Sequence, residues 1–465
     1  MSRIKIGWVG TRDRTGLAPD PLPRLRELSK RLPFDLISYS EDVSSRQATQ
    51  EAAAAFAQAE VDLVLMQCRS FVSDGEAIIP FTEIDARLAM WAIPEPRREG
   101  PLPLNSLTVF NLFTSVIGSY LRDRSIPVKW LYGHVDDPLF LARFEVTVRA
   151  LAALKGVKGA KVALVGGIAP GFVNLSYHKE RVERTLGIQI EEIEIQDVFD
   201  RAKGYASQPV EALVEEITGR AKSSTTPPET VDATARSILA LQDTLSQGGY
   251  DALAVSCWPA FQKEMGIFPC LAFGWLNDTG VVVSCEGDLL GAIGMLALNH
   301  AADDQAMLMD LVEIDQAENA VVWWHCGVGL PSYADVEGFR LITYPTYLPP
   351  GAEPRPMPGV AVDMRFQPQP ATILRLTDDG NKALIVSADI IEGPDRAHTG
   401  VRGWFGNLAL AGIPVTPVEL LDAVVRHGVE HHYAIVRGSV AEAMIEFAHW
   451  MGIEVIAKKP YTNYL

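Results

Sequence analysis

The chain of 465 residues is 48% hydrophobic and 21% charged, which is the composition of a folded globular protein with room for roughly two to four domains. Its 58 acidic and 41 basic residues give a formal net charge of -17 without any Lys/Arg cluster, which argues against a nucleic-acid-binding protein. The five cysteines form no C-x-x-C pair and no metal-knuckle spacing, as is typical of reduced thiols in a cytosolic protein.

Membrane insertion and secretion are not indicated. No apolar run approaches the about 18 residues that a membrane-spanning helix needs. The opening segment MSRIKIGWVGTRD does not have the charged lead and apolar core of a signal peptide. We therefore expect a soluble, cytoplasmic protein without a membrane partner.

Three regions follow one another along the chain. Residues 3–10 have the pattern of a buried strand ending in a Gly turn and residues 22–32 that of an amphipathic helix, and this alternation predicts a doubly wound α/β domain over residues 1–157. The same alternation predicts a second α/β domain over residues 158–340. Residues 341–465 open with a Pro/Gly-rich break and contain a hairpin signal at Asp-Asp-Gly, which predicts a C-terminal β-rich domain.

Two carboxylates follow a predicted strand in the segment GVVVSCEGD, residues 280–288. Glu286 lies where this buried strand should end, and the ligands of open α/β sheets gather at the carboxyl ends of strands, so we interpret Glu286 as functional. Asp288 begins the helical pattern LLGAIGMLALNH, and we interpret it as the cap of that helix.

A third acidic residue, Asp310, comes 24 residues after Glu286. This spacing fits one helix and a return to the neighbouring strand, so we expect both carboxylates at the same sheet edge. Two carboxylates there repel each other unless a cation lies between them, and hard oxygen ligands suit Mg²⁺ or Mn²⁺. A histidine ligand would favour a transition metal.

Three histidines lie next to predicted strands. His325 follows the apolar run VVWW, and His431 and His432 precede an apolar strand. A single histidine in such a position is more often a packing residue than a ligand. Several polar residues at strand ends together favour a site.

These segments resemble a known family. CEGDLLGAIGML resembles the first acidic segment of L-fucose isomerase and its L-arabinose isomerase-like relatives, and MLMDLVEID resembles the second. Residues 428–456 are similar to the segment that carries the family's metal-binding histidine. The resemblance spans most of the chain and implies two α/β domains followed by a β-rich, barrel-like domain. It also implies a homo-oligomer, trimer or hexamer, with sites formed between subunits.

The resemblance also implies roles for single residues. Glu286 and Asp310 would bind Mn²⁺, or another divalent ion such as Mg²⁺ or Co²⁺, and serve as acid and base. His431 would be the third ligand, and His432 a neighbour without a metal role. The implied reaction interconverts an aldose and its 2-ketose through an enediol, whose charge on O1 and O2 needs a cation chelated by both oxygens. His325 would donate a hydrogen bond to a sugar hydroxyl or act as an auxiliary acid or base.

The identity of the sugar is left open at this stage. Shorter relatives of L-fucose isomerase act on sulfoquinovose, so a sulfonated or phosphorylated hexose is an alternative to a neutral aldose. Guanidinium groups in turn-like positions suit such anions, and tryptophan rings can stack on sugars, although surface, subunit-contact or core roles explain each residue as well. The candidates are Arg12, Arg69, Arg402, Trp258 and Trp404.

Two other functions compete with isomerisation. An enzyme with the same metal site could epimerise a sugar or cleave a C–C bond, because both reactions also pass through an enediolate-like intermediate. A sugar-binding protein without catalysis is the alternative from another class. The presence of Glu286, Asp310 and His431 argues against this alternative, since two carboxylates that repel each other serve no purpose in a metal-free binder.

Overall fold

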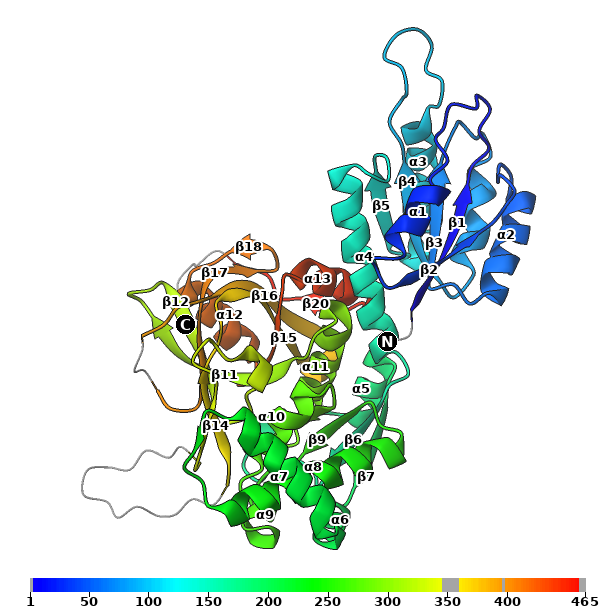
Figure 1. Ribbon diagram of the computed structural model, residues 1–465. Coiled ribbons are helices and arrows are strands. Elements are labelled where there is room, and N and C mark those ends of the chain that lie inside the picture. The colour runs from blue at the N-terminus through cyan, green and yellow to red at the C-terminus, as the bar shows by residue number, and fades with distance from the viewer. Residues whose placement is uncertain (1–2, 345–358, 395–397, 460–465) are drawn as a thin grey trace. The chain divides into compact units, whose positions relative to one another are not determined.

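The structure is a computed structural model that describes residues 3–344, 359–394 and 398–459 (Figure 1). The chain divides into two compact units, Met1–Lys155 and Gly156–Leu465. Both units contain a parallel sheet with helices, and the second also contains a large mixed sheet. The mixed α/β class is thereby confirmed, whereas the three-domain division at 157/158 and 340/341 stays a prediction.

The first unit is built on a five-stranded parallel sheet of order β2-β1-β3-β4-β5. All six residues of β3 are buried, as expected for a strand inside a parallel sheet that is covered on both faces. The strands are β1 Ile4–Gly10, β2 Phe34–Ser38, β3 Leu63–Cys68, β4 Arg87–Ala92 and β5 Val128–Tyr132; the α-helices are α1 Leu22–Leu28, α2 Arg46–Gln58, α3 Ser106–Ser115 and α4 Pro138–Val157. The predicted strand–helix alternation at the N-terminus is confirmed.

The second unit begins with a four-stranded parallel sheet of order β10-β9-β6-β7. Its strands are β6 Lys161–Val165, β7 Gln189–Ile193, β9 Ala252–Val255 and β10 Val282–Ser284. The accompanying helices are α5 Lys179–Leu186, α6 Ile195–Gly204, α7 Ser207–Arg220, α8 Pro228–Gly248, α9 Ala260–Glu264, α10 Cys270–Asp278 and α11 Leu289–Ala302.

The rest of the second unit is dominated by a mixed sheet of order β20-β16-β15-β19-β11-β12-β17-β14-β13-β8. Because β16 also pairs with β17, the six strands from β16 through β15, β19, β11 and β12 to β17 close on themselves as a barrel. The bounds are β8 Ser223–Ser224, β11 Met307–Asp315, β12 Ala320–His325, β13 Arg340–Ile342, β14 Ala361–Arg365, β15 Gln369–Thr377, β16 Lys382–Ile391, β17 Val401–Leu410, β18 Ile413–Pro414, β19 His432–Arg437 and β20 Glu454–Val455, with helices α12 Pro417–His427 and α13 Ala441–Met451. The predicted hairpin at Asp-Asp-Gly joins β15 to β16.

Helix α11 connects the two sheets of the second unit. Its segment LLGAIGMLALNHAA is apolar on every face, and residues 289–298 are all buried, as expected for a helix in the interior of a domain. The helix packs against β9 and β10 on one side and against β15 and β19 on the other. The end of β10 is thereby held beside the start of β19. Among the described helices, none is both long and apolar enough to cross a membrane.

Candidate active site

Glu286 lies in a turn whose backbone is held on two sides. Its φ of 60° is in the left-handed region, which residues other than glycine rarely occupy, and Gly287 follows with a φ of 72°. The carbonyl of Glu286 accepts a hydrogen bond from Ala169 N at 3.0 Å, and Gly287 N donates to the carbonyl of Val255 at 3.0 Å. A residue whose backbone is held in such a costly conformation by its surroundings is typical of functional sites.

Asp310 reaches the same region by way of the mixed sheet. On β11 it is directly opposite Trp324 of β12 and His432 of β19. One helix separates Glu286 from Asp310, as predicted. The strand that carries Asp310 is not a neighbour of β10, however, because β11 pairs in the mixed sheet and β10 lies in the parallel sheet. The reason is the antiparallel pairing of β11 with β12, which joins Asp310 to the barrel strands.

His432 lies at the centre of the polar cluster. Its Nε2 is 3.7 Å from Glu286 Oε2 and 3.7 Å from Asp310 Oδ1, and its side chain is buried. The neighbouring His431 contacts Glu286 Oε2 through Nε2 at 3.1 Å and contacts the amide of Asn174 through Nδ1 at 3.0 Å. The three residues predicted as metal ligands therefore surround a fourth, His432, for which no metal role was predicted.

A buried ionic network orients His432. Asp288 accepts hydrogen bonds from Gly291 N at 2.9 Å, as the predicted cap of α11, and also from His432 Nδ1 at 3.1 Å and Arg375 at 2.5 Å. The other side of the Arg375 guanidinium contacts Glu430 at 3.1 Å. Although burial opposes ionisation, the charge of Arg375 and the hydrogen bond from His432 hold the pKa of Asp288 well below its usual value. Asp288 therefore stays a carboxylate.

The partners of the histidines settle where the protons are. A carboxylate only accepts, so His432 donates from Nδ1 to Asp288, and its Nε2 faces Glu286 and Asp310. By the same argument, His431 donates from Nε2 to Glu286. Burial lowers the pKa of His431, but the hydrogen bond with Glu286 and the charge of Asp310 raise it by more.

The cluster fits a divalent metal. Oδ1 of Asp310 is shielded from solvent and has no hydrogen-bond partner among the described residues, which is costly for a carboxylate oxygen that no cation satisfies. Glu286, His431 and His432 each place one potential ligand atom within 4.8 Å of the others. Carboxylate and imidazole ligands together suit a first-row transition metal or Mg²⁺.

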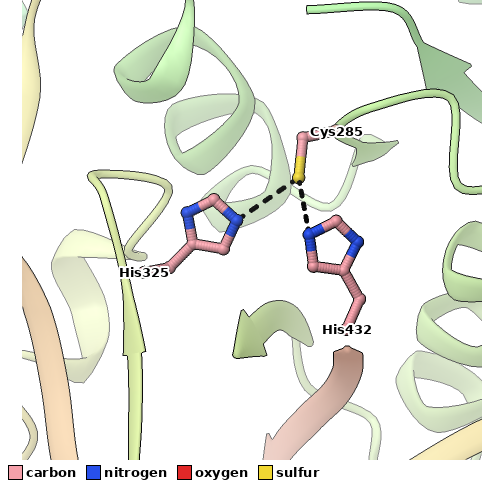
Figure 2. A group of neighbouring side chains, drawn as sticks. All are labelled: Cys285, His325 and His432. Atoms are coloured by element: carbon pink, nitrogen blue, oxygen red, sulfur yellow. Dashed lines mark hydrogen bonds between the residues drawn. The ribbon is translucent and has the colours of Figure 1, made fainter. Parts of the chain in front are cut away.

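A second group with possible ligand atoms contains a sulfur. Figure 2 shows the Sγ of Cys285 between two imidazole rings, at 3.4 Å from His325 Nε2 and 3.6 Å from His432 Nε2. The backbone N–H of Cys326 donates to His325 Nδ1 at 2.8 Å, so in the neutral ring the proton is on Nε2. His325 is thus better suited to donate a hydrogen bond than to bind a metal through Nε2.

A cavity of about 230 Å³ opens beside this cluster. It is lined by Glu286 and His325 together with aromatic side chains, among them Phe172 and Trp258. Trp258 is 39% exposed and available for stacking on a bound ring. The cavity therefore combines an acid, a hydrogen-bond donor and an aromatic surface, as sugar sites do. None of the described residues that line it is Arg or Lys.

The other predicted binding residues are not among those that line this cavity. Trp404 is buried and donates to Asp315, and Arg402 is paired with Asp363 at 2.7 Å; both line a different cavity. Arg12 and Arg69 belong to the first unit, where Arg69 pairs with Asp42 at 2.7 Å and the backbone of Arg12 bonds that of Val43. Their predicted contact with an anionic group stays a prediction.

Sequence reasoning missed Arg375 and Glu430. The sequence did contain a signal for Arg375, because it is the one charged residue inside the apolar strand segment ATILRL. A charged residue in a buried strand needs a buried partner. Glu430 directly precedes the two histidines and gave no comparable signal.

Comparison with known proteins matches this chain to sugar isomerases. No family model matches the chain. Proteins named sulfoquinovose isomerase match it over most of its length: that of Priestia megaterium is 28% identical over 85% of both chains, and that of Alkalicoccus urumqiensis is 26% identical over 91% of this chain and 89% of its own. The chain resembles sulfoquinovose isomerases. The predicted resemblance to a shorter relative of this type is thereby confirmed, and the matches indicate an enzyme that is a sugar isomerase.

Solved structures add little. A solute-binding protein of an ABC transporter from Burkholderia multivorans matches 66% of this chain at 11% identity with a TM-score of 0.19, which is too low to support an argument.

Proposed function

We propose that this chain is a divalent-metal-dependent isomerase that interconverts a sulfonated aldohexose, such as sulfoquinovose, and its 2-ketose. The observation that carries the proposal is the meeting of Glu286, Asp310, His431 and His432 beside a sugar-sized cavity, with a buried Asp310 oxygen that has no hydrogen-bond partner among the described residues. The similarity to sulfoquinovose isomerases supports the reaction and the substrate class.

The residues of the cavity suit proton transfer between neighbouring carbons. Glu286 lines the cavity, so we assign its carboxylate to take the proton from C2 of the aldose and to deliver it to C1. We assign Asp310 to move the hydroxyl proton from O2 to O1. His325, on the same cavity wall, would donate from Nε2 to the sugar oxygen on which charge develops.

A divalent metal, which we take to be Mn²⁺ by the family resemblance, would be held by Glu286, Asp310 and a histidine. When bound, such an ion supplies positive charge that stabilises developing negative charge on two neighbouring sugar oxygens. The resemblance assigns His431 as the histidine ligand. Geometry favours His432 as an additional or alternative ligand, because its Nδ1 is held by Asp288 while its Nε2 faces both carboxylates at 3.7 Å.

The amount of bound metal shows which of the two histidines is the ligand. We would measure bound Mn²⁺ after equilibrium dialysis of His431→Ala and His432→Ala. If His432 is the ligand, H432A should bind Mn²⁺ roughly 10- to 100-fold more weakly, and H431A should stay near wild type. The reverse pattern would support the assignment from the resemblance.

Substrate choice is tested with sugars that differ only in their substituent at C6. The metal-stripped chain, resupplied with Mn²⁺, is offered sulfoquinovose, glucose and glucose 6-phosphate, and ketose formation is followed. We expect Mn²⁺-dependent turnover of sulfoquinovose and much less of glucose, because the chain resembles sulfoquinovose isomerases over most of its length. Preference for glucose would refute the anionic substrate, and preference for the phosphate would favour the phosphorylated alternative.

The inactive sugar-binding protein remains the alternative from another class. Glu286→Gln removes the proposed base while keeping the size of the side chain. Under the isomerase proposal the variant still binds sugar but has lost turnover, whereas a binding protein would show no turnover in either form. The predicted homo-oligomer is tested separately by sedimentation equilibrium.

A further inference from the structure

Four of the five cysteines line the cavity that contains Glu286, and two of them are in contact. Cys270 is the first residue of α10, and Cys326 follows the last residue of β12. Their Sγ atoms are 3.5 Å apart. Since a disulfide requires about 2.0 Å, the two sulfurs need to approach by only roughly 1.5 Å to form one. The α10 and β12 segments are thus already arranged for a cross-link.

An imidazole is next to this pair. His325 Nδ1 is 3.2 Å from the Sγ of Cys326 and accepts the backbone N–H of the same residue at 2.8 Å. The thiolate is the form of cysteine that attacks disulfides, so Cys326 has the environment of a nucleophile and Cys270 that of the resolving thiol. Cys326 is also partly exposed, whereas Cys270 is buried.

The other cysteines do not have this arrangement. Cys68 is fully buried in the first unit. Cys285 contacts two imidazole rings. Among the described residues, no sulfur–sulfur contact other than that of Cys270 with Cys326 is seen. The pair therefore stands apart by its geometry and not only by the number of cysteines nearby.

We propose that Cys270 and Cys326 are a redox-active dithiol in the wall of the cavity, which small-molecule disulfides oxidise to an internal disulfide. The Cys326 thiolate attacks one sulfur of the small disulfide, whose S–S bond breaks and releases one thiolate that takes up the proton. Cys270, after losing its proton, then attacks the Cys326 sulfur of the mixed disulfide and releases the second small thiol. Two protein thiols are oxidised and one small disulfide is reduced to two thiols.

Closure of this disulfide would change the cavity. It moves the chain next to His325 and the start of α10, both of which form the wall that faces Glu286. Because displacements of about 1 Å near reacting groups cost large factors in rate, the oxidised chain should lose turnover by roughly tenfold or more. This consequence for turnover rests on the proposed isomerase function, whereas formation of the disulfide does not.

The test uses the full chain, reduced, freed of reductant and incubated without oxygen with 2-hydroxyethyl disulfide. Free thiols are counted after denaturation, and the linked peptides are identified by mass spectrometry. We expect the five thiols of the reduced chain to fall to three, with a peptide cross-link between Cys270 and Cys326. Cys257→Ser is the matched control, because Cys257 lines the same cavity, and this variant should still form the cross-link. Cys270→Ser should stop at a mixed disulfide on Cys326.

The outcomes are distinguishable. Retention of all five thiols, or a cross-link between other cysteines, would overturn the proposal. This result is measured on the wild-type chain, so it does not depend on whether the serine variants fold. Loss of turnover on oxidation, its recovery with dithiothreitol, and insensitivity of Cys326→Ser, which lacks the attacking thiol, to the same treatment would confirm the effect on the cavity. Unchanged turnover of the cross-linked chain would refute that effect. A reduced chain without any isomerase activity would refute the proposed function. The thiol count would still show whether the disulfide between Cys270 and Cys326 forms.

Discussion

Arg375 offers the sharpest test of how the site is held together. Its side chain is 1% exposed and is the cation between two carboxylates, Asp288 at 2.5 Å and Glu430 at 3.1 Å. Arg375→Met keeps most of the apolar stem and removes the guanidinium. Asp288, itself 1% exposed, would then be a buried carboxylate that, within the described part of the chain, keeps hydrogen bonds from His432 and Gly291 N alone.

The size of the effect follows from these contacts. Each hydrogen bond to a charged group contributes about 1.5–3 kcal/mol, and removal of one partner of a buried ion pair costs about 3–5 kcal/mol. We therefore expect the free energy of unfolding to fall by about 3–5 kcal/mol. For a unit of this size the corresponding decrease in Tm is roughly 5–8 °C.

The assay is urea or thermal unfolding of the metal-stripped chain, so that metal binding does not contribute to the measured stability. Arg426→Met is the matched control, because Arg426 also pairs with an aspartate, Asp422, at 2.7 Å but on an exposed face of α12. This surface pair should contribute only about 0.2–1 kcal/mol. If Arg375→Met lost no more stability than the control, the reasoning about the buried network would be wrong.

Three further predictions concern catalysis, acid stability and packing. Glu286→Gln should lower turnover by about 10²–10⁴-fold with an unchanged unfolding transition, as measured by ketose formation and by circular dichroism. The charge of Arg375 and the bond from His432 outweigh burial and hold the pKa of Asp288 below its usual 3.8, so its carboxylate stabilises the fold above pH 3.8 and that contribution is lost as the pH falls through the lower folded value. Acid unfolding of Asp288→Asn should therefore depend less on pH in this range. Gly274→Ala should cost about 1–3 kcal/mol in urea unfolding, since its Cβ would lie 2.6 Å from the carbonyl oxygen of Gly329.

Controls for two of these predictions exist in α7. Glu211→Gln changes an exposed glutamate of α7 and should leave turnover at the wild-type level. Gly219→Ala places a Cβ in open space within the same helix and should be neutral or stabilising. A lower turnover of Glu211→Gln, or equal costs at Gly274 and Gly219, would contradict the reasoning.

Local patterns in the sequence determined much of the fold and part of the site. Alternating apolar runs and helical patterns indicated the parallel strands of both units, and Asp-Asp-Gly indicated the β15–β16 hairpin. Asp288 was recognised as a helix cap because it directly precedes the apolar segment of α11, and capping is a contact between near neighbours in sequence. Such inferences succeed because they depend on a few adjacent residues.

The tertiary structure alone decided which residues meet. Asp310 is opposite His432 because β11 pairs with β19, more than a hundred residues further along the chain, and Arg375 reaches Asp288 from β15. The proximity of Cys270 and Cys326 likewise follows from the packing of α10 beside the end of β12. Strand register and long-range pairing depend on the closure of the whole barrel, which no local segment specifies. The sequence therefore identified acids and histidines as candidates, and the fold determined which of them face one another.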